Sequence, residues 1–157
     1  GKTIDIHSGR KDLIFPHHEN EIAQSECAHG CTFARYWMHN GFINVDNEKM
    51  SKSKGNFFTI RDIAEHFEHR VIRFFMLTAH YRSPINFSDE LLGQAQNGLE
   101  RIDRCIENIE FSMKGEAGAK DVDLSSFRDK FVEAMDDDLN TADALAAVFM
   151  LVRDIFY

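Results

Sequence analysis

The chain has 157 residues, 43% of them hydrophobic, which allows one ordinary domain or parts of two around a buried core. No stretch approaches the ~20 apolar residues that a membrane-spanning helix needs, so an integral membrane protein is excluded and we expect no membrane partner. The net charge of −8 argues against strong non-specific binding of nucleic acid.

The charge is divided unevenly along the chain. Residues 1–85 carry 11 Lys and Arg against 10 Asp and Glu, whereas residues 86–157 carry 7 against 16. All eight histidines lie between His7 and His80. The first half is therefore balanced in charge and rich in histidine, as a half that bears a site would be. The second half is acidic and has no histidine, so it has fewer residues of the kinds that form functional sites.

Strand and helix patterns alternate in the first half. The predicted elements are a strand over residues 3–7 broken by Ser8-Gly9, a helix over 17–28 ended by Gly30, a strand over 42–45, a helix over 60–67 capped by Thr59, and a helix over 70–80. This order predicts α/β architecture with a parallel sheet.

The second half changes to a helical period. Ser88 is a predicted N-cap, and apolar residues then recur at spacings of three and four from Leu92 to Met113. The seam is compatible with a coiled coil, but two more amphipathic segments follow residues 114–123. They favour an antiparallel helical bundle, so the predicted fold class is α/β followed by all-α.

The run over residues 49–53, Lys-Met-Ser-Lys-Ser, is the most informative in the chain. It holds two lysines, two hydroxyls and no carboxylate. Lysine supplies a compact charge with three donors, and donors aimed at developing charge are usually the largest catalytic term, so the loop suits a polyphosphate. A solvated basic turn is the alternative interpretation.

His17 and Glu21 are a candidate metal-ligand pair. They are four residues apart, so on a helix they share one face and can supply a nitrogen and an oxygen to zinc. His18 and Glu21, three apart, are a second pairing. An ordinary surface hydrogen bond is the alternative to a metal.

The three cysteines are an odd number without framework spacing, which predicts free thiols and a cytoplasmic protein. Cys27 and Cys31 have the spacing C-x3-C, but Gly30 is expected to break the helix between them. For these two and for Cys105 we favour small buried hydrophobes over metal ligands.

Several segments resemble one family. Residues 6–21, IHSGRKDLIFPHHENE, resemble a segment of the cysteinyl-tRNA synthetases, and residues 49–53 resemble the KMSKS motif that all class I synthetases share. Further segments similar to that family are YWMHNG at 36–41, HYRS at 80–83 and AMDDDLNT at 134–141. The resemblance runs through nearly the whole chain.

The resemblance implies a zinc centre. The family holds zinc with two cysteines, a histidine and a glutamate, and His17 and Glu21 match the last two. Both cysteine ligands are expected upstream of residue 1, so Cys27 and Cys31 are not among them. The metal binds the thiolate of the substrate, and a soft thiolate is a far better zinc ligand than the hydroxyl of serine.

The resemblance also implies the reaction, in which cysteine and ATP, with Mg²⁺, form cysteinyl-adenylate and the acyl group then passes to the cognate tRNA. Lys52 is expected to stabilise the phosphate charge, and Lys49 to assist it or anchor the loop. The other residues expected at the adenylate site are Gly9, Asp12, Ile43, Ser51 and Ser53.

The chain departs from the family pattern at two positions. Ser8 and Arg10 stand where family members usually have glycines. A side chain at position 10 would narrow the approach of the nucleotide or point to solvent.

We expect an internal fragment of a larger enzyme, inactive by itself and holding zinc weakly. The last helix is still in its apolar period at Phe156-Tyr157, and the HIGH motif and the anticodon-binding region of the family are missing. The expected parts are the C-terminal part of a Rossmann-like catalytic domain (1–68), a connecting segment of the stem-contact type (69–87) and the start of a tRNA-binding helical bundle (88–157).

Two other functions remain open. One is the cysteine ligase of mycothiol synthesis, which shares the binding of a thiolate by zinc and the lysine-rich loop. The other is a module that contacts tRNA or a protein without catalysis. The glutamate at position 21 favours the synthetase over the first of these.

Overall fold

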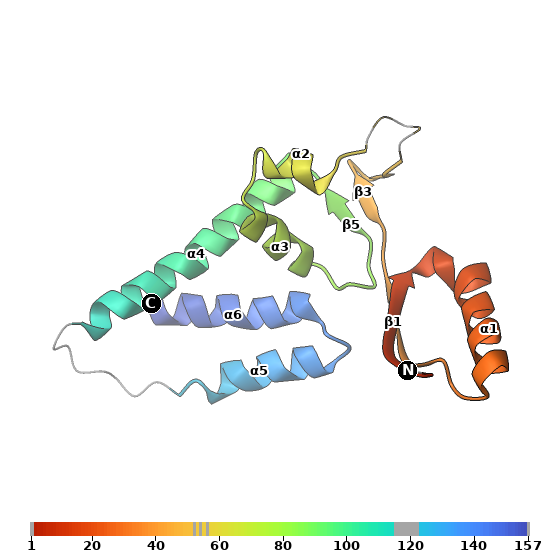
Figure 1. Ribbon diagram of the computed structural model, residues 1–157. Helices are drawn as coiled ribbons and strands as arrows, with labels where there is room; N and C mark the ends of the chain where they lie inside the picture. The colour runs from red at the N-terminus through yellow and green to blue at the C-terminus, as the bar shows by residue number, and fades with distance from the viewer. Residues whose placement is uncertain (1, 52, 54, 56, 115–122, 157) are drawn as a thin grey trace.

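The computed structural model describes residues 2–51, 53, 55, 57–114 and 123–156 (Figure 1). The helices and strands are β1 (Ile4–Arg10), α1 (Glu19–His29), β2 (Ala34–Asn40), β3 (Ile43–Val45), β4 (Glu48–Lys49), α2 (Ile60–Ala64), α3 (His69–Leu77), β5 (Ile85–Phe87), α4 (Asp89–Met113), α5 (Ser125–Asp136) and α6 (Thr141–Phe156). The order confirms an α/β part followed by an all-α part.

Strands β1 and β2 form a parallel pair, with Ile4 opposite Ala34 and Arg10 opposite Asn40. Helix α1 connects them, so the three elements make one βαβ unit (Figure 1). The prediction of a parallel sheet is therefore confirmed. Its partner strand, however, is β2, which the sequence did not predict.

Two predicted boundaries in this unit are wrong. Ser8 and Gly9 continue β1 to Arg10, since both pair with β2 in the regular register. Helix α1 begins at Glu19, after a 3-10 turn (Lys11–Leu13) and a π-helical turn (Ile14–His18). The helix ends as predicted, because Gly30 adopts a left-handed φ of 66°.

A second, smaller sheet holds the order β4-β3-β5. Strand β3 runs antiparallel to β4 and parallel to β5. The buried core lies where this sheet meets α3 and α4, and its members are Val45, Val71, Phe74, Phe75, Phe87, Leu92 and Ala95. The β1–β2 unit lies outside this core.

Side-chain caps begin two helices as predicted. Thr59 and Asp62 form a reciprocal capping box at the start of α2, although the helix ends at Ala64 and not at residue 67. The hydroxyl of Ser88 accepts a hydrogen bond from the backbone N–H of Leu91 at the start of α4.

The helical part contains α4 and an antiparallel hairpin of α5 and α6, with α6 packed against α4 (Figure 1). The predicted seam of α4 is buried only near its start, at Leu92 and Ala95, whereas Ile106 and Met113 are exposed. Among the described helices, none combines the length and the apolar character needed to cross a bilayer.

The cysteine prediction holds for one residue of three. Cys105 is buried in α4, Cys31 is half-buried and Cys27 is exposed on α1. The last turn of α1 faces solvent at position 27, so the thiol there is not a core residue.

Candidate functional site

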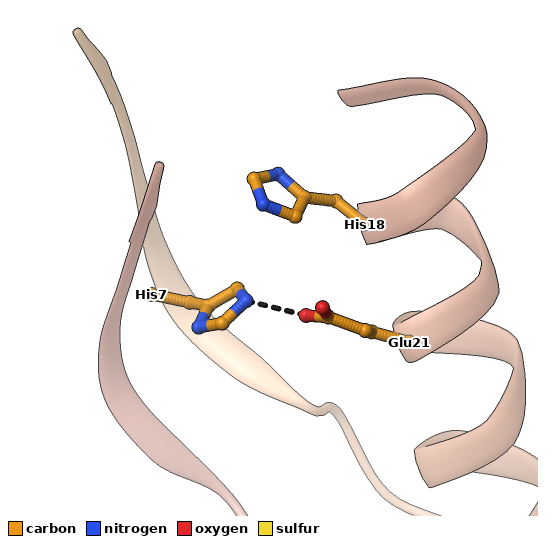
Figure 2. Close-up of side chains that lie close together, drawn as sticks. All are labelled: His7, His18 and Glu21. Carbon is orange, nitrogen blue, oxygen red and sulfur yellow. Dashed lines mark hydrogen bonds and ion pairs between the residues drawn. The ribbon is translucent and has the colours of Figure 1, made fainter. Parts of the chain in front are cut away.

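Strand β1, the π-helical turn and α1 bring together His7, His18 and Glu21, which we call the His7–His18–Glu21 group (Figure 2). His7 comes from β1, His18 from the end of the π-helical turn, and Glu21 from the first turn of α1. Nε2 of His7 lies 2.5 Å from Oε2 of Glu21. The imidazole donates this hydrogen bond, because a carboxylate can only accept.

His18 is buried, with 5% of its surface exposed. Its Nδ1 lies 2.9 Å from Nε2 of His39 on β2, so one ring donates and the other accepts. Burial lowers the pKa of His39, and the charges of His18, Arg82 and His7 lower it further. A pKa below the ordinary range keeps His39 neutral at neutral pH.

Trp37 closes the site on the β2 side. Its ring centroid lies 4.8 Å from that of His7 and 5.1 Å from that of His18, and it stacks on His39 at 5.9 Å. Trp37 is the one tryptophan of the sequence. Its indole is therefore a built-in probe of the histidines.

The group has the donor chemistry of a zinc site. Its two imidazole nitrogens and one carboxylate oxygen lie within 4.8 Å of one another, and these are ligand types that zinc accepts. Three ligands leave one tetrahedral position for a further donor. The arrangement therefore fits a metal that also binds a substrate atom.

The structure does not bring His17 into this group. His17 is exposed, and the histidines grouped with Glu21 are His7 and His18, the neighbour of His17. His18 and Glu21, three residues apart, both belong to the group, and their pairing as metal ligands stays a prediction. His17 as a zinc ligand stays a prediction based on the resemblance.

Sequence reasoning missed that His7 and His39 both belong to this site. In the β1–β2 register His7 lies opposite Trp37 and Gly9 opposite His39, so all four positions lie on one face of the sheet. A period of two over residues 37 and 39 was the signal available. Without β2 in the prediction it could not be used.

At the end of β1, Arg10 and Asp12 form an ion pair. Nε of Arg10 donates to Oδ1 of Asp12 at 3.0 Å, and a second guanidinium nitrogen contacts Oδ2. The hydrogen bond to Asp12 raises the pKa of Arg10. The guanidinium also lies 5.4 Å from the centre of the Phe42 ring, so Arg10 joins β1 to the residue before β3.

The lysine loop is described only in part. Lys52 lies outside the described residues, and so does the side chain of Lys49, whose backbone ends β4. The hydroxyls of Ser51 and Ser53 are 3.1 Å apart. The carbonyl of Ile43 accepts a weak hydrogen bond from the N–H of residue 50, which ties the loop to β3.

Gly9 has a packing role that the sequence did not reveal. A Cβ at this position would lie 2.9 Å from Cε1 of His18 and 3.2 Å from Cδ1 of Leu13. Only a residue without a side chain lets the His18 ring approach the strand this closely. The adenylate roles expected for Gly9, Asp12, Ile43 and the two serines stay predictions.

Two protein-family models match parts of this chain. The model for tRNA synthetases class I (C) catalytic domain matches residues 1–97, more than half of the chain. The chain belongs to this family. A second model, the DALR domain, matches residues 130–155, which cover most of α5 and α6.

Several curated relatives of this synthetase chain are named Cysteine--tRNA ligase. It is 56% identical to Cysteine--tRNA ligase of Clostridioides difficile over 98% of the chain, and 56% identical to the protein of that name from Geobacter metallireducens, also over 98%. These matches cover 35% and 33% of the relatives. The chain thus spans about a third of the length of the curated relatives it matches.

Solved synthetase structures share the fold. A ternary complex of LeuRS from Agrobacterium radiobacter has a TM-score of 0.80 at 17% identity, covering 97% of this chain and 22% of that one. Methionyl-tRNA synthetase from Mycobacterium tuberculosis, with methionyl-adenylate, has a TM-score of 0.72 at 23% identity, covering 96% and 32%. At these identities the likeness concerns the fold alone.

Proposed function

We propose that the protein ligates cysteine to its cognate tRNA through cysteinyl-adenylate, with ATP and Mg²⁺. The observation that carries the proposal is identity of 51–56% to relatives named Cysteine--tRNA ligase over nearly the whole chain. The activity belongs to the whole protein, because the chain spans about a third of those relatives. Free thiols favour a cytoplasmic location.

In this mechanism the lysine loop handles the phosphates. Lys52 would stabilise the charge that develops on the leaving pyrophosphate, and Lys49 would assist it or hold the loop. Ser51 and Ser53 would donate hydrogen bonds or shape the turn. Gly9, Asp12 and Ile43 would line the adenylate at the strand ends, where open α/β sheets bind ligands.

The second part of the proposal is a zinc site that includes Glu21. The histidine ligand is His17 by resemblance and His18 by the geometry of the group, while His7 lies beside His18 and Glu21. A bound zinc would select a thiolate over a hydroxyl, because a soft ligand binds it better. The His18–His39 hydrogen bond would fix the orientation of the ring, as partners of metal-bound histidines do.

Adenylate formation tests the first part. Cysteine-dependent exchange between pyrophosphate and ATP should occur with the whole protein, and Lys52→Ala should lower its kcat by about 10²–10³-fold with little change in KM. Lys130→Ala on α5 is the matched control and should behave as wild type. An enzyme that consumes cysteine and ATP but never charges tRNA would instead indicate the mycothiol ligase.

Metal analysis tests the second part. Glu21→Gln should lower the zinc content of the purified protein. His17→Asn and His18→Asn then decide which histidine is the ligand, because one should lower the zinc content and the other should not. Full zinc retention in Glu21→Gln would contradict the assignment.

A further inference from the structure

The turn between α5 and α6 is hydrogen-bonded to the segment at 79–84, which precedes β5. The carboxylate of Asp138 accepts hydrogen bonds from the hydroxyl of Tyr81 at 2.8 Å and from Nη2 of Arg82 at 3.1 Å, and Nε of Arg82 contacts it as well. The Arg82 guanidinium also lies 5.2 Å from the centre of the Tyr81 ring. We call Asp138, Tyr81 and Arg82 the Asp138 anchor.

A separate hydrogen bond supports the same contact. The hydroxyl of Thr141, the first residue of α6, donates to the carbonyl of Ala79 at 3.4 Å. Burial raises the pKa of Tyr81, and its hydrogen bond to Asp138 raises it further. The phenol therefore stays protonated and keeps its donor role.

The opposite side of this segment supports the connection between the two sheets. The N–H of Gly41 donates to the carbonyl of Tyr81 at 2.8 Å, and the N–H of Ile85 donates to the carbonyl of Phe42 at 2.9 Å. A Cβ at Gly41 would lie 2.2 Å from the carbonyl oxygen of Ser83. The backbones are thus in direct contact, with no room for a side chain.

Gly41 and Phe42 are the two residues that join β2 to β3. Strand β2 carries Trp37 and His39, which contact the His7–His18–Glu21 group; we call these five residues the histidine site. Strand β3 leads through β4 into the lysine loop, the run over residues 49–53. The segment at 79–84 therefore contacts the connection through which the two sheets are joined. The hairpin turn lies on one side of this segment and the connection lies on the other (Figure 1).

We propose that the Asp138 anchor positions the histidine site relative to the sheet β4-β3-β5, so that the helical hairpin sets the geometry of the proposed adenylation site. Its three members act as positioning residues. The expected effect on the adenylation rate rests on the proposed function. The expected effect on the position of the histidine site does not. Asp138 and Arg82 are 43% and 46% exposed, so we expect an effect on geometry more than on stability.

The test uses the protein as produced from its complete gene. Asp138 has a left-handed φ of 54°, which asparagine tolerates well, so Asp138→Asn removes the charge without backbone strain. Asp136→Asn, two residues earlier, is the matched control for charge. The emission and quenching of Trp37 report the site without any need for activity; where other tryptophans are present, they are first replaced by phenylalanine.

The expected result is a change of Trp37 emission in Asp138→Asn but not in Asp136→Asn. Cysteine-dependent adenylation should lose about 10-fold in kcat with KM within about threefold, since small displacements of reacting groups are costly. Arg82→Lys keeps the charge and loses the paired contact, so it should reproduce the effect in part. The double variant should be less than additive, because both changes break one interaction.

Unchanged Trp37 emission and unchanged kcat in Asp138→Asn would overturn the inference. If Asp138→Asn fails to fold, Tyr81→Phe and Arg82→Lys carry the test with the same two readouts. A wild-type protein without adenylation activity would contradict the proposed function alone. The Trp37 response would then still decide whether the anchor positions the site.

Discussion

At the scale of single residues, the histidine site depends on a glycine, Gly9, which has no side chain. The His18 ring packs directly on the backbone of β1 at Gly9, where any Cβ would lie 2.9 Å from Cε1. That contact places the ring beside His39 and Trp37. Gly9 therefore shapes the site through packing, whether or not it also contacts a nucleotide.

Gly9→Ala should displace His18 and lower stability by about 1–3 kcal/mol, the usual cost of overpacking. Urea denaturation followed by Trp37 fluorescence measures both effects. Gly93→Ala on α4 is the control, because its Cβ would have no neighbour within 4 Å. In a helix that change should stabilise by about 0.5–1 kcal/mol. Equal stability of Gly9→Ala and wild type would contradict the packing argument.

Local chemistry made part of the site predictable. Helical spacing placed Glu21 near a histidine, and His18, one of the two considered, belongs with Glu21 to the group. The choice between His17 and His18 depends on the π-helical turn before α1, which spacing rules do not contain. The contributions of His7 and His39 depend on contacts between distant residues.

At the scale of elements, caps and turns were predictable, whereas β2 was not. Thr59, Ser88 and Gly30 mark helix ends through their own side chains or backbone. Strand β2 instead places Trp37 and His39 on its inner face, so the usual alternation of apolar and polar residues is lost. Residues placed for a site often break the pattern of the element that carries them.

The capping box of α2 gives a prediction for one element. Thr59→Ala removes the oxygen that accepts from the N–H of Asp62 at 3.2 Å and should cost about 1 kcal/mol. Amide hydrogen exchange over Ile60–Ala64 should become faster. Thr59→Ser keeps the hydroxyl and should stay near wild type. Equal exchange in the alanine and serine variants would argue against a capping role.

At the scale of the whole molecule, the site and the core are separate. Within β1, α1 and β2 only Ala34 is buried, whereas the core gathers around Leu92, which is fully buried. The two sheets are joined covalently by Gly41 and Phe42 and laterally by the segment at 79–84. The site unit therefore has less apolar burial to hold it than the helical part.

We therefore expect two separate unfolding transitions, one for the unit of β1, α1 and β2 and one for the helical part. In urea, Trp37 fluorescence should change at lower concentration than the helical circular dichroism at the core. Leu92→Ala should destabilise the helical transition by about 2–5 kcal/mol, as large-to-small core changes do. Leu77→Ala, at a residue 46% exposed, should cost far less. Coincident transitions for both probes would show one cooperative unit instead.

The contact between the hairpin and the sheets should also depend on pH. The hydrogen bonds from Arg82, and then from Tyr81, lower the pKa of Asp138 to about 2. The unfolded chain has an ordinary aspartate pKa of about 3.9, so the folded state binds the proton less readily. The stabilisation is therefore complete above about pH 4 and is lost as the pH falls towards 2.

The measurement is the urea midpoint of wild type and of Asp138→Asn, from neutral pH down to about pH 2. Asp62 and Asp123 also have lowered pKa values, through hydrogen bonds at Thr59 and Ser125, but both proteins share them. The difference between the two midpoints should shrink between about pH 4 and about pH 2, as Asp138 protonates. A difference that stays constant throughout would mean that the Asp138 carboxylate does not hold the hairpin to the sheets.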